Sequence, residues 1–172
     1  DSTEASVSTS SLTFNASNWN QAQTVTVSGV DDPIRDELVN SAIAVAIDKS
    51  STNDTKYAAL SSKSVSVSTS DDEGNPIVSV ATSVNSMDES GGMAILAVKQ
   101  DTVAVTNTTV TLNTSGTAIL NSDYSLSSTS LTIPAGSREV KATLQAVSDD
   151  IDEVVEKVEV SIGSVSGGNG AK

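Results

Sequence analysis

Short runs in which apolar and polar residues alternate recur along the whole chain. The most regular are residues 64–68 and 157–162, where valine or isoleucine alternates with serine, lysine or glutamate. A period of two residues is typical of a strand with one buried face. No segment carries apolar residues at helical spacing over a helical length. The pattern therefore predicts an all-β chain.

Ten strands are predicted from this alternation, separated by turns rich in Ser, Asn, Asp and Gly. They are residues 7–14, 23–30, 41–47, 64–68, 77–80, 93–98, 103–112, 130–133, 138–147 and 157–162. A spacing of roughly 8–12 residues between strands is typical of a β-sandwich. The Gly- and Ser-rich tail, residues 163–172, is expected to be frayed.

A domain junction is predicted where Asp, Glu, Gly and Pro follow one another. The segment 71–76 reads Asp-Asp-Glu-Gly-Asn-Pro, and such residues end a strand and resist starting another. The predicted domains are residues 1–73 and residues 74–172.

Composition excludes several function classes. The net charge of −13 argues against nucleic acid, which needs clustered Lys and Arg, and an anionic membrane surface would repel the chain. No apolar run is long enough to insert into a membrane. The chain has no Cys and no His, which rules out disulfides, Ser-His or Cys-His nucleophiles and typical zinc or copper sites. Because it opens on Asp1 without Met, it is expected to be part of something longer.

Carboxylates gather where predicted strands begin or end. One group opens the strand at 157–162, a second lies at 31–37 and a third at 71–73. Such clusters of hard oxygen ligands on loops between strands suggest calcium. The competing interpretations are a plain solvated loop, and a pair of carboxylates working as in a glycosidase. The second is disfavoured because the acids lie at strand tips beside a hinge, with no aromatic-lined cleft apparent.

Two parts of the chain repeat one pattern. Residues 12–47 and 131–162 each contain a short strand, a turn, a long alternating strand, an acidic group and another strand. A repeat of roughly 100 residues suggests a tandem array of sandwiches.

Residues 116–162 resemble the Calx-beta motif in four features: Gly-Thr-Ala at 116–118, Asp-Tyr at 123–124, a strand followed by Pro-Ala-Gly at 134–136, and an acidic loop. Residues 12–32, followed by Asp36, are similar to Calx-beta-like repeats of large bacterial surface proteins. The resemblance implies tandem immunoglobulin-like antiparallel β-sandwiches, each binding calcium at one end.

The resemblance also implies which residues bind calcium. In the second repeat they are Glu89, Asp123, Asp149, Asp150, Glu153 and Glu156. In the first repeat they are Asp31, Asp32, Asp36, Asp71, Asp72 and Glu73.

The chain departs from the family pattern in three places. Ser148 stands where the family usually has the first Asp of its pair. The first repeat lacks its opening strands, and the second stops before its last strand. Each sandwich is therefore expected to be incomplete, and another copy of the chain is one source of a missing strand.

These features predict a structural and spacer module, not an enzyme, from a large secreted or cell-surface protein of adhesin type. Calcium would remove the repulsion between the carboxylates and stiffen the junction, which Asp, Glu and Gly would otherwise leave flexible. The expected partners are calcium ions, neighbouring repeats and, by strand exchange, another copy. The alternative is a module that binds a glycan or a protein, although an aromatic content of 2% disfavours sugar stacking.

Overall fold

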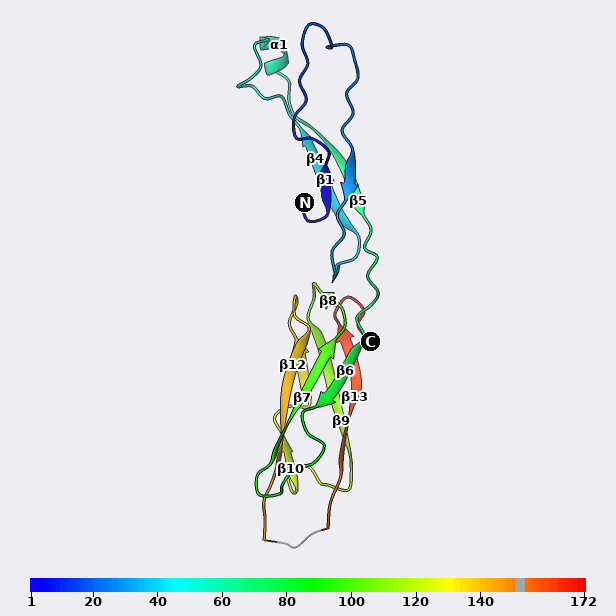
Figure 1. The fold of residues 1–172 in the computed structure, drawn as a ribbon, viewed down its shortest axis with the longest axis vertical. Helices are drawn as coiled ribbons and strands as arrows, with labels where there is room; N and C mark the ends of the chain where they lie inside the picture. The colour runs from blue at the N-terminus through cyan, green and yellow to red at the C-terminus, as the bar shows by residue number, and fades with distance from the viewer. Residues whose placement is uncertain (151–153) are drawn as a thin grey trace. The chain divides into compact units, whose positions relative to one another are not determined.

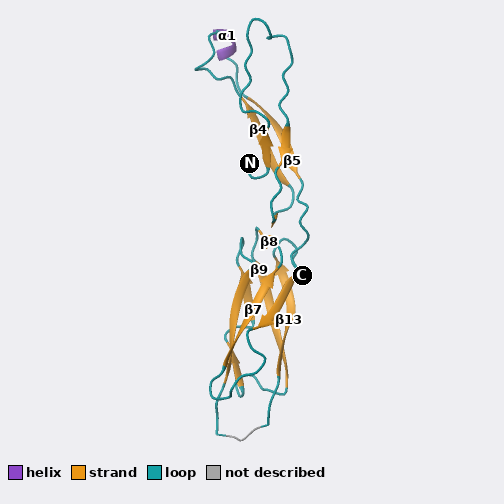
Figure 2. Cartoon of the chain, in the orientation of Figure 1, coloured by secondary structure: helices purple, strands orange, loops and turns teal. Residues whose placement is uncertain are grey.

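Hydrogen-bonded strands account for nearly all of the regular structure in this computed structural model, which describes residues 1–150 and 154–172. Among the described residues the one helix is a single short turn, drawn purple in Figure 2. The all-β class predicted from the alternating pattern is confirmed.

The chain divides into two compact units. The first contains Asp1–Asp32 and Glu37–Asp71, and the second contains Pro33–Asp36 and Asp72–Lys172. Because the short segment Pro33–Asp36 belongs to the second unit, the chain passes between the units three times, after Asp32, Asp36 and Asp71.

Two antiparallel sheets make up most of the second unit as the structure describes it. Their strands are β6 (Val78–Thr82), β7 (Met93–Gln100), β9 (Thr108–Gly116), β10 (Tyr124–Leu126), β11 (Ser130–Ile133), β12 (Glu139–Ala146) and β13 (Val158–Gly167). One sheet has the order β10-β12-β7-β6, and these strands are labelled in Figure 1. The other sheet has the order β11-β9-β13.

The core of the second unit lies between these sheets. Alternate residues of each strand face inward, as in β7, where Ala94, Leu96 and Val98 are buried. Opposite them, Val110 and Ile133 are fully buried on the other sheet. The remaining buried members of this cluster are Val78, Leu112, Tyr124, Leu131, Ala142, Leu144 and Ala171. The period-2 pattern in the sequence is thus the inner face of a sandwich.

One predicted strand is broken in two. Residues 103–112 form β8 (Val103–Ala104), which pairs in parallel with β3 (Ile34–Arg35), and then β9. Between them the backbone turns toward the tail: the N–H and Oγ1 of Thr106 both donate to Asn169 Oδ1, at 3.1 and 2.9 Å. Hydrogen bonds to a side chain thus replace the strand pairing that continuous alternation predicts.

The tail is not frayed, so that prediction was wrong. β13 runs on to Gly167, and Ala171 is buried in the core. Lys172 bonds to the start of β6: its N–H donates to Pro76 O at 3.0 Å, and its carbonyl accepts from Val78 N at 2.8 Å. Glycines make this possible because residues 167–170 all have positive φ, between 53° and 86°. The same composition that indicated fraying permits the turn.

The first unit contains two separate strand pairs. β1 (Ala5–Val7) pairs antiparallel with β2 (Val27–Gly29), and β4 (Val39–Val45) pairs antiparallel with β5 (Lys63–Thr69). Glu4 connects the two pairs, because its carbonyl accepts from Val30 N at 3.0 Å and from Thr69 Oγ1 at 2.9 Å.

Apolar side chains in the first unit stay largely exposed. Val45 and Val65, on β4 and β5, are 59% and 58% exposed, and Trp19 in a turn is 67% exposed. Burial is confined to the neighbourhood of Glu4, Ala5 and Ser41. The first unit therefore has a much smaller interior than the second.

Two strands predicted in the first unit are shorter than expected. Of residues 7–14 only Val7 lies in a strand, at the end of β1, and of residues 23–30 only the three residues of β2 do. In the second unit the matching segment, β11, pairs with β9. No described strand of the first unit takes the place of β9, so residues 12–14 have apolar alternation but no backbone partner.

The short helix α1 (Thr55–Ala58) was not predicted. Asp54 caps it, accepting from Lys56 N at 2.8 Å and from Tyr57 N at 3.3 Å. A single capped turn is too short to show a 3.6-residue period, so hydrophobic patterning cannot detect it. This helix is not long enough to cross a membrane, and the described residues contain no other.

Candidate metal centre

Three segments that carry predicted calcium ligands are hydrogen-bonded to one another at one end of the second unit. Val147, just after β12, donates its N–H to Asp123 O at 2.9 Å. Asp149 donates its N–H to Glu89 Oε1 at 3.3 Å. The loop after β12, the turn before β7 and the turn before β10 are therefore held together by hydrogen bonds, and each carries an acidic residue.

A tight turn presents Glu89. The carboxylate of Asp88 accepts from Ser90 N at 3.1 Å and from Ser90 Oγ at 2.8 Å, and these bonds lower the pKa of Asp88. Gly92 closes the turn by donating to Asp88 O at 2.8 Å. A Cβ at Gly92 would lie 2.6 Å from that oxygen, so only glycine fits without a shift.

Asp88 is a positioning residue that sequence reasoning missed. The available signal was Asp followed two residues later by Ser, which is the spacing of an Asx turn.

Asp123 is fixed by a second turn. Its Oδ2 accepts from Ile119 N at 2.5 Å, and its own N–H donates to Ile119 O at 2.9 Å. Tyr124, the next residue, is buried in the core. One carboxylate oxygen of Asp123 is thus engaged, while a carboxylate has about four acceptor sites in all and retains capacity for a cation.

The carboxylates at this end are accessible to solvent. Glu89, Asp149 and Asp150 are exposed and Asp123 is half-buried. Glu156 is exposed beyond the loop, and Glu153 lies outside the described residues. Within the described part of this end, no three acidic side chains converge closely enough to share an ion. Calcium would have to draw them together, which flexible acidic loops allow.

The other predicted ligands stand where the chain passes between the units. Asp31, Asp32 and Asp71 belong to the first unit, and Asp36, Asp72 and Glu73 belong to the second. Within the first unit, Asp71 Oδ2 accepts from Glu37 N at 2.9 Å, and Glu37 has a positive φ of 73°. The Asp71 carboxylate therefore supports an unfavourable backbone conformation at this crossing.

A loop between β4 and α1 holds a different kind of acidic site. The Asp48 carboxylate accepts from Ser50 Oγ at 2.6 Å, Ser51 Oγ at 2.7 Å and Ser50 N at 2.9 Å. These hydrogen bonds favour the charged form and lower the pKa of Asp48 to about 2. This carboxylate closes its own loop and was not among the predicted ligands.

The low pKa predicts the pH behaviour of this loop. A lowered folded-state pKa means that the carboxylate supports the loop above the unfolded value of 3.8, and that this support is lost as pH falls toward 2. Titration of the Asp48 carboxyl carbon by NMR is expected to give a midpoint near 2. The Ser50→Ala variant should raise the midpoint toward 3.8 because it loses the largest contributor. A wild-type midpoint at 3.8 would contradict the hydrogen-bonded loop.

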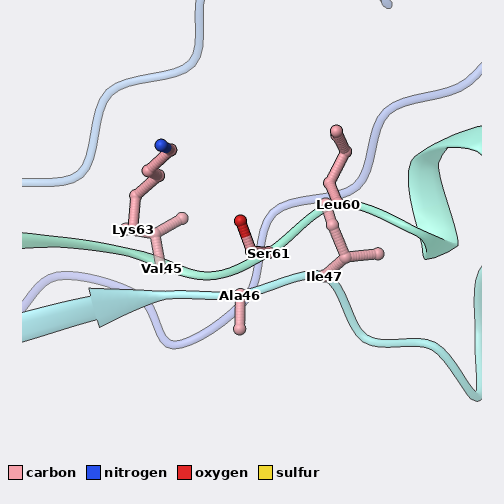
Figure 3. Close-up of a pocket in the computed structure, with 6 residues that line it drawn as sticks. All are labelled: Val45, Ala46, Ile47, Leu60, Ser61 and Lys63. Atoms are coloured by element: carbon pink, nitrogen blue, oxygen red, sulfur yellow. The ribbon is translucent and has the colours of Figure 1, made fainter.

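A pocket of about 320 Å³ lies in the first unit, between the end of β4 and the segment leading into β5 (Figure 3). Six residues line it: Val45, Ala46, Ile47, Leu60, Ser61 and Lys63. No carboxylate is among them, so this pocket is not a calcium site.

Comparison with known families identifies the second unit. The model of the Calx-beta domain matches residues 71–171, which is more than half of the chain. The chain belongs to the Calx-beta family. No curated protein and no solved structure is similar enough to count as a match.

The Calx-beta match covers nearly the whole second unit, including Glu89, Asp123, Asp149 and Asp150. It confirms the family inferred from the sequence. Calx-beta domains are non-catalytic β-sandwich modules that are known to bind calcium. The two-sheet architecture of the second unit is that of a sandwich.

Proposed function

We propose that this chain is a calcium-binding structural and spacer module of a large secreted or cell-surface protein of adhesin type. One observation carries the proposal: in the Calx-beta unit, the contact of Asp149 N with Glu89 Oε1 draws acidic loops to one end of the sandwich. A site at a sandwich end leaves the sheets free to act as a rigid spacer. The partners we propose are calcium ions and neighbouring repeats.

The proposed site at this end uses Glu89, Asp123, Asp149 and Asp150, with Glu153 and Glu156 from the rest of the acidic loop. Calcium takes six to eight oxygens at about 2.3–2.6 Å, and water and backbone carbonyls complete such shells. Its charge would remove the repulsion among neighbouring carboxylates. The acidic loop would then be fastened to the turns before β7 and β10.

A second proposed site lies at the junction. Asp31, Asp72 and Glu73 are acidic residues close in sequence to the points where the chain passes from one unit to the other. Asp32, Asp36 and Asp71 stand beside them in the chain. An ion bound here would attach one unit to the other through charged ligands, and so stiffen a junction rich in Asp, Glu and Gly.

We further propose that residues 1–73 belong to one Calx-beta-like sandwich and that residues 74–172 belong to a second. The parallel between 12–47 and 131–162 supports this division. No enzymatic activity is proposed, since the family is non-catalytic and the chain has neither His nor Cys for a nucleophile pair.

Calcium is expected to raise the melting temperature by several degrees, and magnesium much less. A ligand that binds only the folded state adds RT ln(1 + [L]/Kd), about 2.7 kcal/mol at a hundredfold excess over Kd. Thermal melts in excess calcium, in excess magnesium and in chelator measure this. Magnesium makes the better comparison ion because it demands a tighter octahedral shell than calcium.

Variants separate the two proposed sites. Glu89→Gln with Asp149→Asn should abolish the shift at the sandwich end, and Asp72→Asn with Glu73→Gln should abolish the contribution of the junction. Glu159→Gln is the control, because Glu159 is exposed and pairs with Lys157, two residues before it in the chain. The same samples give ¹⁵N relaxation, which should show the units tumbling together only with calcium and only with the junction acids intact. Equal melts in calcium and chelator would refute calcium binding by this chain.

A further inference from the structure

The outer edge of β13 is open. β13 is ten residues long and is the last strand of the order β11-β9-β13, so only the side facing β9 has a partner strand among the described residues. Alternate N–H and C=O groups of an edge strand point away from the sheet. The unpartnered edge carries a single charged residue, Glu159.

The edge of β6, at the end of the other sheet, is less suited to pairing with an added strand. Lys172 already bonds to Val78 N, at the first residue of β6, and to Pro76 O, two residues before it. β6 is also only five residues long. The long strand β13 is therefore the better place for an added strand in the second unit.

β5 offers a matching edge. It pairs only with β4, so its other side is free of described strands, and its one charged residue is Lys63. Val65 is 58% exposed and Val67 is half-buried, with serines between them. β5 is thus half of an unfinished sheet, with the same alternation as residues 158–162 of β13.

The internal repeat indicates that these two edges suit each other. β4 and β13 follow the acidic group in their respective repeats, and β4 pairs antiparallel with β5 over seven residues. A strand with the sequence of β5 therefore already pairs with the repeat equivalent of β13. In the second unit, no described strand takes that position.

We propose that the outer edge of β13 in one copy of this chain pairs antiparallel with the outer edge of β5 in a second copy. The register that joins the apolar faces sets Val65 opposite Ile162 and Val67 opposite Val160, which sets Ser66 opposite Ser161. The joined sheet has the order β11-β9-β13-β5-β4, with the last two strands from the second copy. Neither β strand has to leave its present partner.

Charge does not oppose this contact locally. Lys63 and Glu159 have opposite signs, and neither edge carries a second charge, although the whole chain has a net charge of −13. At physiological salt the Debye length is about 8 Å, so repulsion between the remaining acids is screened. The contact joins different surfaces of the two copies, and such heterologous contacts form open chains unless the rotation closes a ring.

Cross-linking tests the pairing directly, because the chain has no Cys and any introduced thiol is unique. The full chain with Ser66→Cys is mixed with the full chain with Ser161→Cys under oxidised glutathione, without added calcium. We expect a mixed disulfide dimer at a yield at least tenfold above that of Ser66→Cys with Ser79→Cys, which lies on β6. Equal yields in the two mixtures would overturn the pairing. So would cross-linking of Ser161→Cys mainly with itself.

Sedimentation of the uncoupled chain supplies the second readout. Association should increase with concentration at physiological salt, and Val65→Lys should weaken it at least tenfold. Val45→Lys is the matched control, since Val45 is equally exposed but lies on β4, away from the joining edge. A chain that stays monomeric up to millimolar concentration, or that responds equally to both lysines, contradicts the proposal.

Discussion

Replacing Ile133 with alanine is expected to lower the free energy of unfolding of the Calx-beta unit by about 2–5 kcal/mol. Ile133 is fully buried at the end of β11, where it pairs with Thr108, which is also fully buried. The smaller side chain would leave a cavity between the two sheets. The wall of that cavity is made by strands paired on both sides, such as β9 and β7, so it cannot collapse easily.

Urea denaturation of the two-unit chain, followed by NMR signals of the second unit, measures this loss. Ile119→Ala is the control, because Ile119 is 63% exposed and its truncation should change stability by at most about 0.5 kcal/mol. Similar losses in the two variants would mean that the sandwich interior is not where the structure puts it.

Replacing Gly116 with alanine is expected to lower the free energy of unfolding of the Calx-beta unit by about 3 kcal/mol or more. Gly116 ends β9 with φ at 126°, a conformation that costs an L-residue about 1–3 kcal/mol. In addition, a Cβ there would lie 2.0 Å from Lys157 O. That oxygen accepts from Thr117 N at 2.9 Å, so the clash would open the β9–β13 pairing at this end.

Gly136→Ala separates conformational strain from the clash. Gly136 also has a positive φ, of 77°, but a Cβ there would meet nothing within 4 Å. The free energy of unfolding of the Gly136→Ala variant should be lower than that of the wild type by only about 1 kcal/mol. Hydrogen exchange of β13 amides should be accelerated in Gly116→Ala and unchanged in Gly136→Ala. Equal losses would show that the backbone near Lys157 can move aside.

Alternation located strands well where a partner strand exists. The predicted strand at residues 130–133 has the bounds of β11, and the prediction at 138–147 differs from β12 by one residue at each end. Residues 12–14 carry a similar Leu-Thr-Phe pattern but form no strand. The difference lies outside the segment, in the presence of β9 beside one and not the other. The local sequence indicates which face of a strand would be buried. It does not indicate whether a partner strand is present beside it.

Where a strand ends depends on individual hydrogen bonds, which the alternation of apolar and polar residues does not encode. Asn169, within the glycine-rich tail, holds Thr106 in the segment that separates β8 from β9. The proposed calcium ligands differ in this respect. Residue type and position in the repeat indicated which residues they are, but not how their side chains are placed. The turns at Asp88 and Asp123 show how the fold positions two of them, and only coordinates supply that.

The hydrogen bonds of Lys172 with Pro76 and Val78 have a topological consequence. They place the first and last backbone segments of the Calx-beta unit side by side. The order in which its strands are synthesised is therefore separable from the order in which they pair. A circular permutant that links Lys172 to Asn75 through a short glycine linker, and opens the turn at Gly136, would keep every strand pairing of both sheets. The same neighbouring ends would let this sandwich be inserted into a surface loop of an unrelated host protein.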